Sequence, residues 1–143
     1  MNIFLDTSSL VKIYHRETGT DELMMLFKEG RVEKMFLSSL TRVELHAALW
    51  KRYRMKHISI EMREIFAANF ERDTVKYSWI EDNDEIKQNA ITLLNKYGSD
   101  VSLKSFDSLQ LATAASLRNE ADLFITADKV LQKLFLAERL PIN

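Results

Sequence analysis

Cysteine is absent from the 143-residue sequence, so the chain can form neither disulfide bonds nor thiolate metal sites. Its three histidines, His15, His46 and His57, do not show the spacing of a histidine metal site. A metal ion bound to this chain would therefore rely mainly on oxygen ligands.

Glycine and proline are also scarce, with three and one residues respectively, and no repeat or low-complexity linker interrupts the sequence. We therefore expect one domain over residues 1–143, a length that supports a proper hydrophobic core. No apolar run reaches the roughly 18 residues that a membrane-spanning helix needs. Residues 1–5 lead into a predicted strand without a basic leader, which predicts a soluble cytoplasmic protein with no membrane partner.

A large net charge is missing as well, because 20 basic and 21 acidic residues give a formal net charge of −1. This balance argues against binding nucleic acid through overall charge, although it allows a local basic patch. The candidate patch consists of Lys51, Arg52, Tyr53, Arg54 and Lys56. Cationic side chains around an aromatic ring suit phosphate contacts and base stacking on single-stranded RNA. The alternative is a solvated helix end, where cations interact favourably with the helix dipole.

Short apolar segments alternate with longer helical patterns along the chain. The apolar and β-branched runs predict strands at residues 2–5, 35–37, 74–79 and 123–125, and a short edge strand at 140–142. Helical periodicity predicts helices at about 8–16, 20–30, 41–57, 59–72, 83–97, 105–119 and 128–138, with Thr20 and Ser59 as caps. This alternation predicts an α/β fold, with a mostly parallel sheet of four or five strands flanked by helices.

Four acidic residues occupy positions that fit a structural role as well as a functional one. Asp6 and Asp128 each follow a predicted strand, and each can simply cap the helix that comes next. Glu44 can complete a capping box with Thr41. Asp107 can interact with the positive end of the dipole in the first turn of its helix. Each explanation is sufficient for one residue taken alone.

The four positions are more informative together, because the carboxyl ends of parallel strands meet at one edge, where ligands bind. Two of the acids follow strands and two begin helices, so the fold is expected to gather all four at that edge. Carboxylates in one cleft repel each other, and a divalent cation removes the repulsion. Hard oxygen ligands favour Mg²⁺ or Mn²⁺, and such an ion can support phosphodiester hydrolysis.

Four short blocks of sequence carry a resemblance to a known family. In order, they read Phe-Leu-Asp-Thr-Ser, Ser-Leu-Thr-Arg-Val-Glu, Phe-Asp-Ser-Leu-Gln-Leu-Ala-Thr-Ala and Phe-Ile-Thr-Ala-Asp. With these blocks spread over nearly the whole chain, the sequence resembles PIN-domain ribonucleases, in particular the VapC toxins of prokaryotic toxin–antitoxin pairs. The resemblance implies a PIN-like three-layer fold and a single PIN-like nuclease domain.

The resemblance also implies roles for individual residues and partners. The catalytic and metal-binding acids would be Asp6, Glu44, Asp107 and Asp128. Of these, Asp6 and Asp107 would be the principal ligands of Mg²⁺ (or Mn²⁺). The hydroxyl groups that support the acids would belong to Thr7, Ser8 and Thr126. The implied partners are an RNA substrate, a small antitoxin protein that blocks the cleft, and a second copy of the chain in a homodimer.

Other functions remain open from the sequence. A PIN domain can act in RNA processing outside a toxin pair, and a non-catalytic metal-binding interaction module can keep the same fold. A phosphoacceptor receiver domain or a phosphatase with a nucleophilic aspartate would need a second acid close to Asp6. Thr7 and Ser8 occupy those places, which disfavours both.

Overall fold

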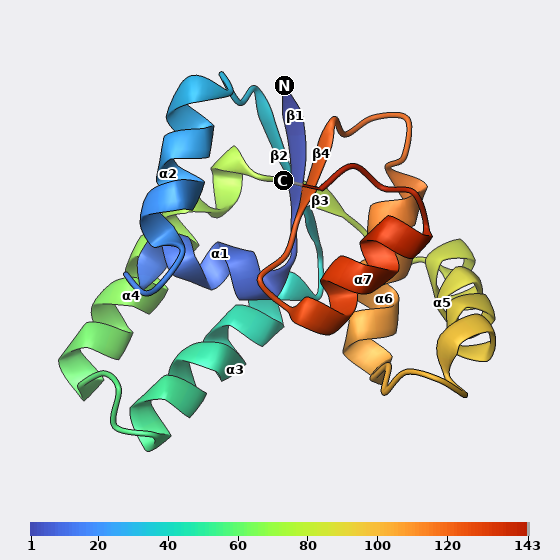
Figure 1. Ribbon diagram of the computed structural model, residues 1–143. Helices are drawn as coiled ribbons and strands as arrows, with labels where there is room; N and C mark the ends of the chain where they lie inside the picture. The colour runs from blue at the N-terminus through green and yellow to red at the C-terminus, as the bar shows by residue number, and fades with distance from the viewer. Residues whose placement is uncertain (143) are drawn as a thin grey trace.

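The computed structural model describes residues 1–142, in which helices and strands alternate along most of the chain (Figure 1). In order, the elements are β1 (Asn2–Leu5), α1 (Thr7–Tyr14), α2 (Thr20–Glu29), β2 (Lys34–Ser38), α3 (Thr41–Arg54), α4 (Ile60–Asp73), the short 3-10 helix η1 (Thr74–Lys76), β3 (Ser78–Ile80), α5 (Asp84–Tyr97), α6 (Ser105–Ser116), β4 (Leu123–Ile125) and α7 (Lys129–Ala137). None of the helices in this described part is long and apolar enough to cross a membrane.

The strands form a parallel sheet in the order β3-β2-β1-β4. Residues 3–5 of the central strand β1 are fully buried, as expected for a strand that is covered on both faces. A lone parallel bridge joins Phe124 to Ile142, so the expected edge strand at 140–142 is reduced to one residue pair. The predicted α/β fold with a mostly parallel sheet is confirmed.

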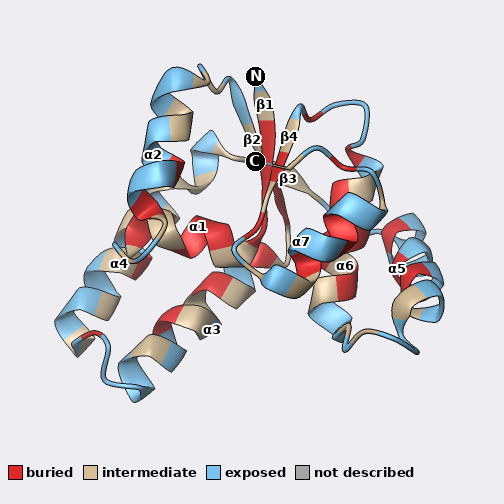
Figure 2. Ribbon diagram, in the orientation of Figure 1, coloured by how far each residue is buried: buried red, intermediate tan, exposed pale blue. Residues whose placement is uncertain are grey.

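Helices cover both faces of the sheet, with α1 to α4 on one side and α5 to α7 on the other (Figure 1). Ile3 and Leu5 pack into the core beneath α1, α3 and α4, whereas Phe4 packs into the core beneath α5, α6 and α7. This division follows from the alternation of side chains along a strand. Figure 2 shows the buried residues concentrated in the strands and on the inner faces of the helices.

One of the two predicted helix caps is confirmed, and the other is wrong. Ser59 caps α4, because its Oγ accepts a hydrogen bond from the Met62 backbone N–H at 3.1 Å. Thr20 does not cap α2; the preceding residue is Gly19, whose φ of +95° lies in the region that favours glycine. The Thr20 hydroxyl instead donates to the Lys12 carbonyl at 3.0 Å and ties the start of α2 to α1.

The predicted strand at residues 74–79 is wrong over its first half. The chain continues from α4 into η1, and the Thr74 hydroxyl donates to the Glu71 carbonyl at 2.8 Å, which satisfies a group at the helix end. The strand β3 therefore contains only the last part of the apolar run. Three helices also end two or three residues earlier than predicted, namely α1 at Tyr14, α3 at Arg54 and α6 at Ser116.

Candidate active site

Asp6 lies at the carboxyl end of β1, beside the carboxyl end of β4. Because the two strands pair in parallel and end together, Asp6 and Thr126 become neighbours. Thr126 Oγ1 donates to Asp6 Oδ2 at 2.6 Å, and the Ser8 hydroxyl lies 2.8 Å from both carboxylate oxygens. Asp6 Oδ1 also accepts from the Ser9 backbone N–H at 3.0 Å, so Asp6 caps α1 as well.

The Asp6 carboxyl is buried, with only 2 % of the residue surface exposed. Burial raises its pKa from 3.8 to about 6, while hydrogen bonds from Thr126, Ser8 and Ser9 oppose the rise. At neutral pH the group is therefore ionised in a place where water screens its charge poorly. A cation next to it would stabilise the charged form.

Glu44 lies in the first turn of α3, and side chains from two other helices hold its carboxylate. Thr7 Oγ1 of α1 donates to Glu44 Oε1 at 3.1 Å, and Gln110 Nε2 of α6 donates to the same oxygen at 2.8 Å. The capping-box alternative is wrong, because the N-cap of α3 is Leu40 and no side chain caps this helix. Thr41 is the first helical residue, and its hydroxyl accepts from Gln110 Nε2 at 2.8 Å.

Asp107 lies in the first turn of α6 and is partly buried. Burial raises the pKa of its carboxyl, and the negative charges of Asp128 and Glu44 raise it further, while Lys104 lowers it. The Asp107 carboxylate of α6 is therefore repelled by one acid of α3 and by one acid in the loop after β4.

Asp128 follows β4 and caps α7, since its Oδ1 accepts from the Leu131 backbone N–H at 2.8 Å. Its own backbone N–H donates to Thr126 Oγ1 at 3.0 Å, and that hydroxyl in turn donates to Asp6. Thr126 thus connects the segments that carry two of the acids. Capping occupies one oxygen of Asp128 and leaves its second oxygen for other contacts.

The predicted acids come together, because Asp6, Glu44, Asp107 and Asp128 all line one cleft of about 390 Å³. Among residues 1–142, no three aspartate, glutamate or histidine side chains lie close enough to form a complete metal cage. A hydrated Mg²⁺ ion needs no such group, since it usually keeps several waters and binds one or two carboxylates directly. The all-oxygen donor set and the mutual repulsion of the acids match the same kind of ion.

Only part of the candidate basic patch, residues 51–56, lines this cleft. Lys51 and Arg52 line it, and Arg52 reaches it because positions 44, 48 and 52 share one face of α3. Arg52 Nη2 lies 3.2 Å from Glu17 Oε1, and Glu17 also lines the cleft. The lining does not include Tyr53, Arg54 and Lys56.

The sequence did not point to two residues of the cleft, Glu17 and Gln110. Glu17 lies in the loop after α1, 35 residues from its partner Arg52, and no local pattern marks such a pair. Gln110 is 2 % exposed, and the residues that follow it in α6, 111–115, are leucine, alanine and threonine. The sequence signal for Gln110 was a polar amide among the apolar residues of a predicted helix, since a buried amide needs hydrogen-bond partners.

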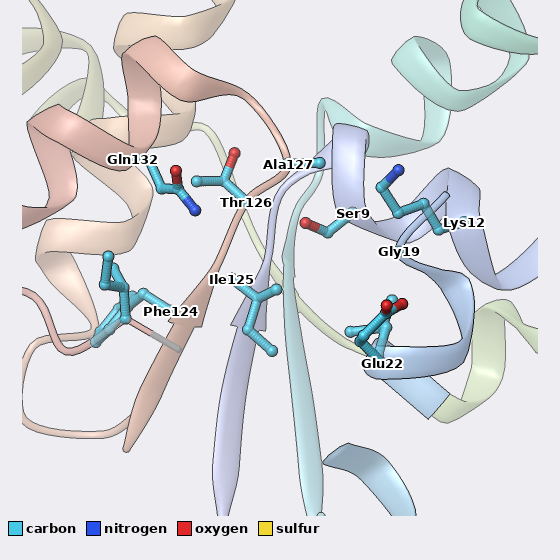
Figure 3. A pocket seen from close by; sticks show the side chains of 11 residues that line it. Ser9, Lys12, Gly19, Glu22, Phe124, Ile125, Thr126, Ala127 and Gln132 are labelled. Atoms are coloured by element: carbon cyan, nitrogen blue, oxygen red, sulfur yellow. The ribbon is translucent and has the colours of Figure 1, made fainter. Parts of the chain in front are cut away.

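A second cavity, of about 260 Å³, lies between α1 and α2 on one side and β4 and α7 on the other. In Figure 3, Ser9 and Lys12 approach it from α1, and Gln132 approaches it from α7. Glu22 is the one acidic residue among its lining residues, so this cavity lacks the group of carboxylates that marks the larger cleft.

The fold and the larger cleft define an α/β domain with an acidic site at the carboxyl edge of a parallel sheet. A family model described as the PIN domain matches residues 3–134, which is most of the chain. The chain therefore belongs to the PIN domain family. This is a nuclease family, and its members generally use divalent metal ions.

Several solved structures share the fold at low sequence identity. The toxin VapC20 of Mycobacterium tuberculosis, described as cleaving the sarcin–ricin loop, has a TM-score of 0.68 at 14% identity, covering 92% of this chain and 94% of its own. VapBC2 of Rickettsia felis, bound to a DNA fragment from its promoter, has a TM-score of 0.69 at 14% identity, with coverages of 100% and 98%. FitAcB of Neisseria gonorrhoeae has a TM-score of 0.69 at 14% identity, with coverages of 98% and 95%. No curated protein matches the sequence significantly.

Proposed function

We propose that the protein is a Mg²⁺- or Mn²⁺-dependent ribonuclease that hydrolyses RNA phosphodiester bonds as the toxin of a VapBC-type toxin–antitoxin pair. The observation that carries this proposal is the single cleft lined by Asp6, Glu44, Asp107 and Asp128. Membership of the PIN family supports the nuclease activity, and the shared fold with VapC toxins supports the toxin role. The proposed location is the cytoplasm.

Asp6 and Asp107 are the proposed principal ligands of the cation, and Glu44 and Asp128 complete the site directly or through water. A divalent cation bound there lowers the pKa of a water molecule and offsets negative charge on the phosphoryl group. The burial of Asp6 and the repulsion at Asp107 both favour cation binding, because a cation stabilises the ionised carboxylates.

Hydroxyl groups around the acids have a proposed orienting role. Thr7 holds Glu44, while Ser8 and Thr126 hold Asp6. Hydrogen bonds of this kind fix the direction of a carboxylate before it meets a cation.

The RNA backbone is proposed to run along the basic wall of the cleft, where Lys51 and Arg52 can contact phosphates. Arg52 Nη2 donates to Glu17 Oε1 at 3.2 Å, and this contact fixes the direction of the guanidinium group. The proposed contacts farther from the scissile bond come from Tyr53, Arg54 and Lys56.

Two protein partners are also proposed, a small antitoxin and a second copy of the chain. VapBC2 and FitAcB are toxin–antitoxin complexes with the same fold, which supports an antitoxin that blocks the cleft. A small antitoxin-like reading frame beside the gene would favour the toxin role, whereas a lone gene would favour RNA processing. Sedimentation of the purified protein tests the homodimer.

The activity itself is tested by incubating the purified protein with RNA and Mg²⁺. The wild type should cleave RNA, EDTA should stop cleavage, and Asp107→Asn should be inactive. Asp100→Asn, which changes an exposed carboxylate outside the cleft, is the matched control and should keep full activity. Cleavage in EDTA, or an Asp107→Asn variant as active as the wild type, would show that the proposal is wrong.

A further inference from the structure

Gln110 connects three helices at the inner wall of the acidic cleft. Its side chain is buried in α6, and its Nε2 donates to Thr41 Oγ1 and to Glu44 Oε1, each at 2.8 Å. The same nitrogen lies 3.2 Å from Thr7 Oγ1. One amide group therefore reaches the first turns of both α1 and α3.

The chemistry of the neighbours sets the orientation of this amide. A carboxylate accepts hydrogen bonds and donates none, so the NH₂ group must face Glu44, and the reverse orientation would place two acceptors together. The other end of the amide, Gln110 Oε1, is buried and has no hydrogen-bond partner among residues 1–142. An unpaired buried acceptor is unfavourable for folding. The amide therefore keeps its hydrogen bond to Glu44 although its own oxygen has no partner in this part of the chain.

The hydrogen bonds also distinguish the two oxygens of Glu44. Within the described residues, both donors to this carboxylate, Gln110 and Thr7, bond to Oε1. The second oxygen, Oε2, is left for contacts in the cleft that Glu44 lines. The pair of donors thus selects which oxygen of Glu44 is available to a cation or to a water bound to it.

We propose that Gln110 is a positioning residue that fixes the Glu44 carboxylate for cation binding, an inference that rests on the proposed function. Gln110 acts through Glu44 and does not itself contact the cation. Loss of an orienting group behind a metal ligand typically lowers metal affinity about 10- to 100-fold. The same range is expected for Gln110→Met, which keeps the length of the side chain and removes both N–H donors.

The test is a calorimetric titration with Mn²⁺, which needs no RNA cleavage. Gln110→Met should bind Mn²⁺ at least about tenfold more weakly than the wild type. Gln110→Asn, which keeps the amide on a shorter side chain, should behave similarly and serves as a second variant if the first fails to fold. Gln88→Met makes the same change at an exposed position of α5 and should bind like the wild type.

A double-mutant cycle with Glu44→Gln separates positioning from a general effect on the fold. If Gln110 acts through Glu44, adding Gln110→Met to Glu44→Gln should cause no further loss of Mn²⁺ affinity. Equal affinity of Gln110→Met and the wild type, or losses that multiply in the double variant, would overturn the inference and leave the nuclease proposal intact. A wild type that binds no Mn²⁺ would instead overturn both proposals.

Discussion

Replacing Asp6 with asparagine should stabilise the metal-free protein at neutral pH while removing a proposed metal ligand. Asparagine keeps the size of the side chain and can still cap α1, but it carries no charge. Burial places the pKa of Asp6 at about 6, against 3.8 for the ordinary carboxyl. At about 1.4 kcal/mol per pKa unit, the buried charge costs on the order of 3 kcal/mol, and the substitution should recover part of that.

The effect should depend on pH with a definite sign. Between about pH 3.8 and 6 the folded protein holds more protons at Asp6 than the unfolded chain does, because its pKa is raised by folding. The stabilising contribution of the protonated group is fully present below 3.8 and is lost as the pH rises through about 6. The advantage of Asp6→Asn over the wild type should therefore be small at pH 4 and largest above pH about 6.5.

The assay is urea unfolding in EDTA at a series of pH values, with the free energy of unfolding taken from each curve. Comparing the variant with the wild type at each pH cancels the titration of the other carboxyl groups. Asp100→Asn controls for the loss of one negative charge and should show no such pH-dependent gain. A variant less stable than the wild type at pH 7.5, or a difference that does not change with pH, would refute the reasoning.

Three further predictions concern the pH dependence at Asp6, the basic side chain Arg52 and the buried ring of Phe124. The Mn²⁺ affinity of the wild type should fall as the pH drops below about 6, because protons compete with the cation for Asp6. Thr126→Val should move this fall to higher pH, because it removes a hydrogen bond that lowers the pKa of Asp6. Mn²⁺ titrations at several pH values measure both effects. Arg52→Ala should weaken RNA binding and reduce the slope of log K against log salt by about 0.7, whereas Arg54→Ala should have the smaller effect; filter binding at several salt concentrations measures this. Phe124→Ala should lower the free energy of unfolding by about 3–5 kcal/mol in urea titrations, because the ring is buried against two other phenylalanines.

Local patterns in the sequence were sufficient for the central strand of the sheet and for the acid that follows it. The apolar run of residues 3–5 identifies a strand buried on both faces, and Asp6 stands where that strand ends. Asp128 lies three residues beyond the end of β4 and caps α7. Since parallel strands end at a common edge, the sequence predicts that these two acids lie at the same edge of the sheet.

The sequence was less informative at boundaries where two local preferences compete. Thr74 and Val75 are β-branched and suit a strand, yet the structure continues α4 into η1 there. Thr20 has a side chain that can cap a helix, but its hydroxyl bonds back to α1. At Thr20 the contact with α1, and at Thr74 the local hydrogen bond to Glu71, outweigh propensities that differ by less than about 1 kcal/mol.

The amino-acid sequence by itself determined most of the strands and helices, because these follow from short-range periodicity, and it showed which acids follow strands or begin helices. Only the tertiary structure decided how the acids are held. Gln110 meets Glu44 across 66 residues of chain, and Arg52 meets Glu17 across 35. Pairs so distant in the chain leave no local pattern, because their geometry is set by the packing of α1, α3 and α6 around the cleft.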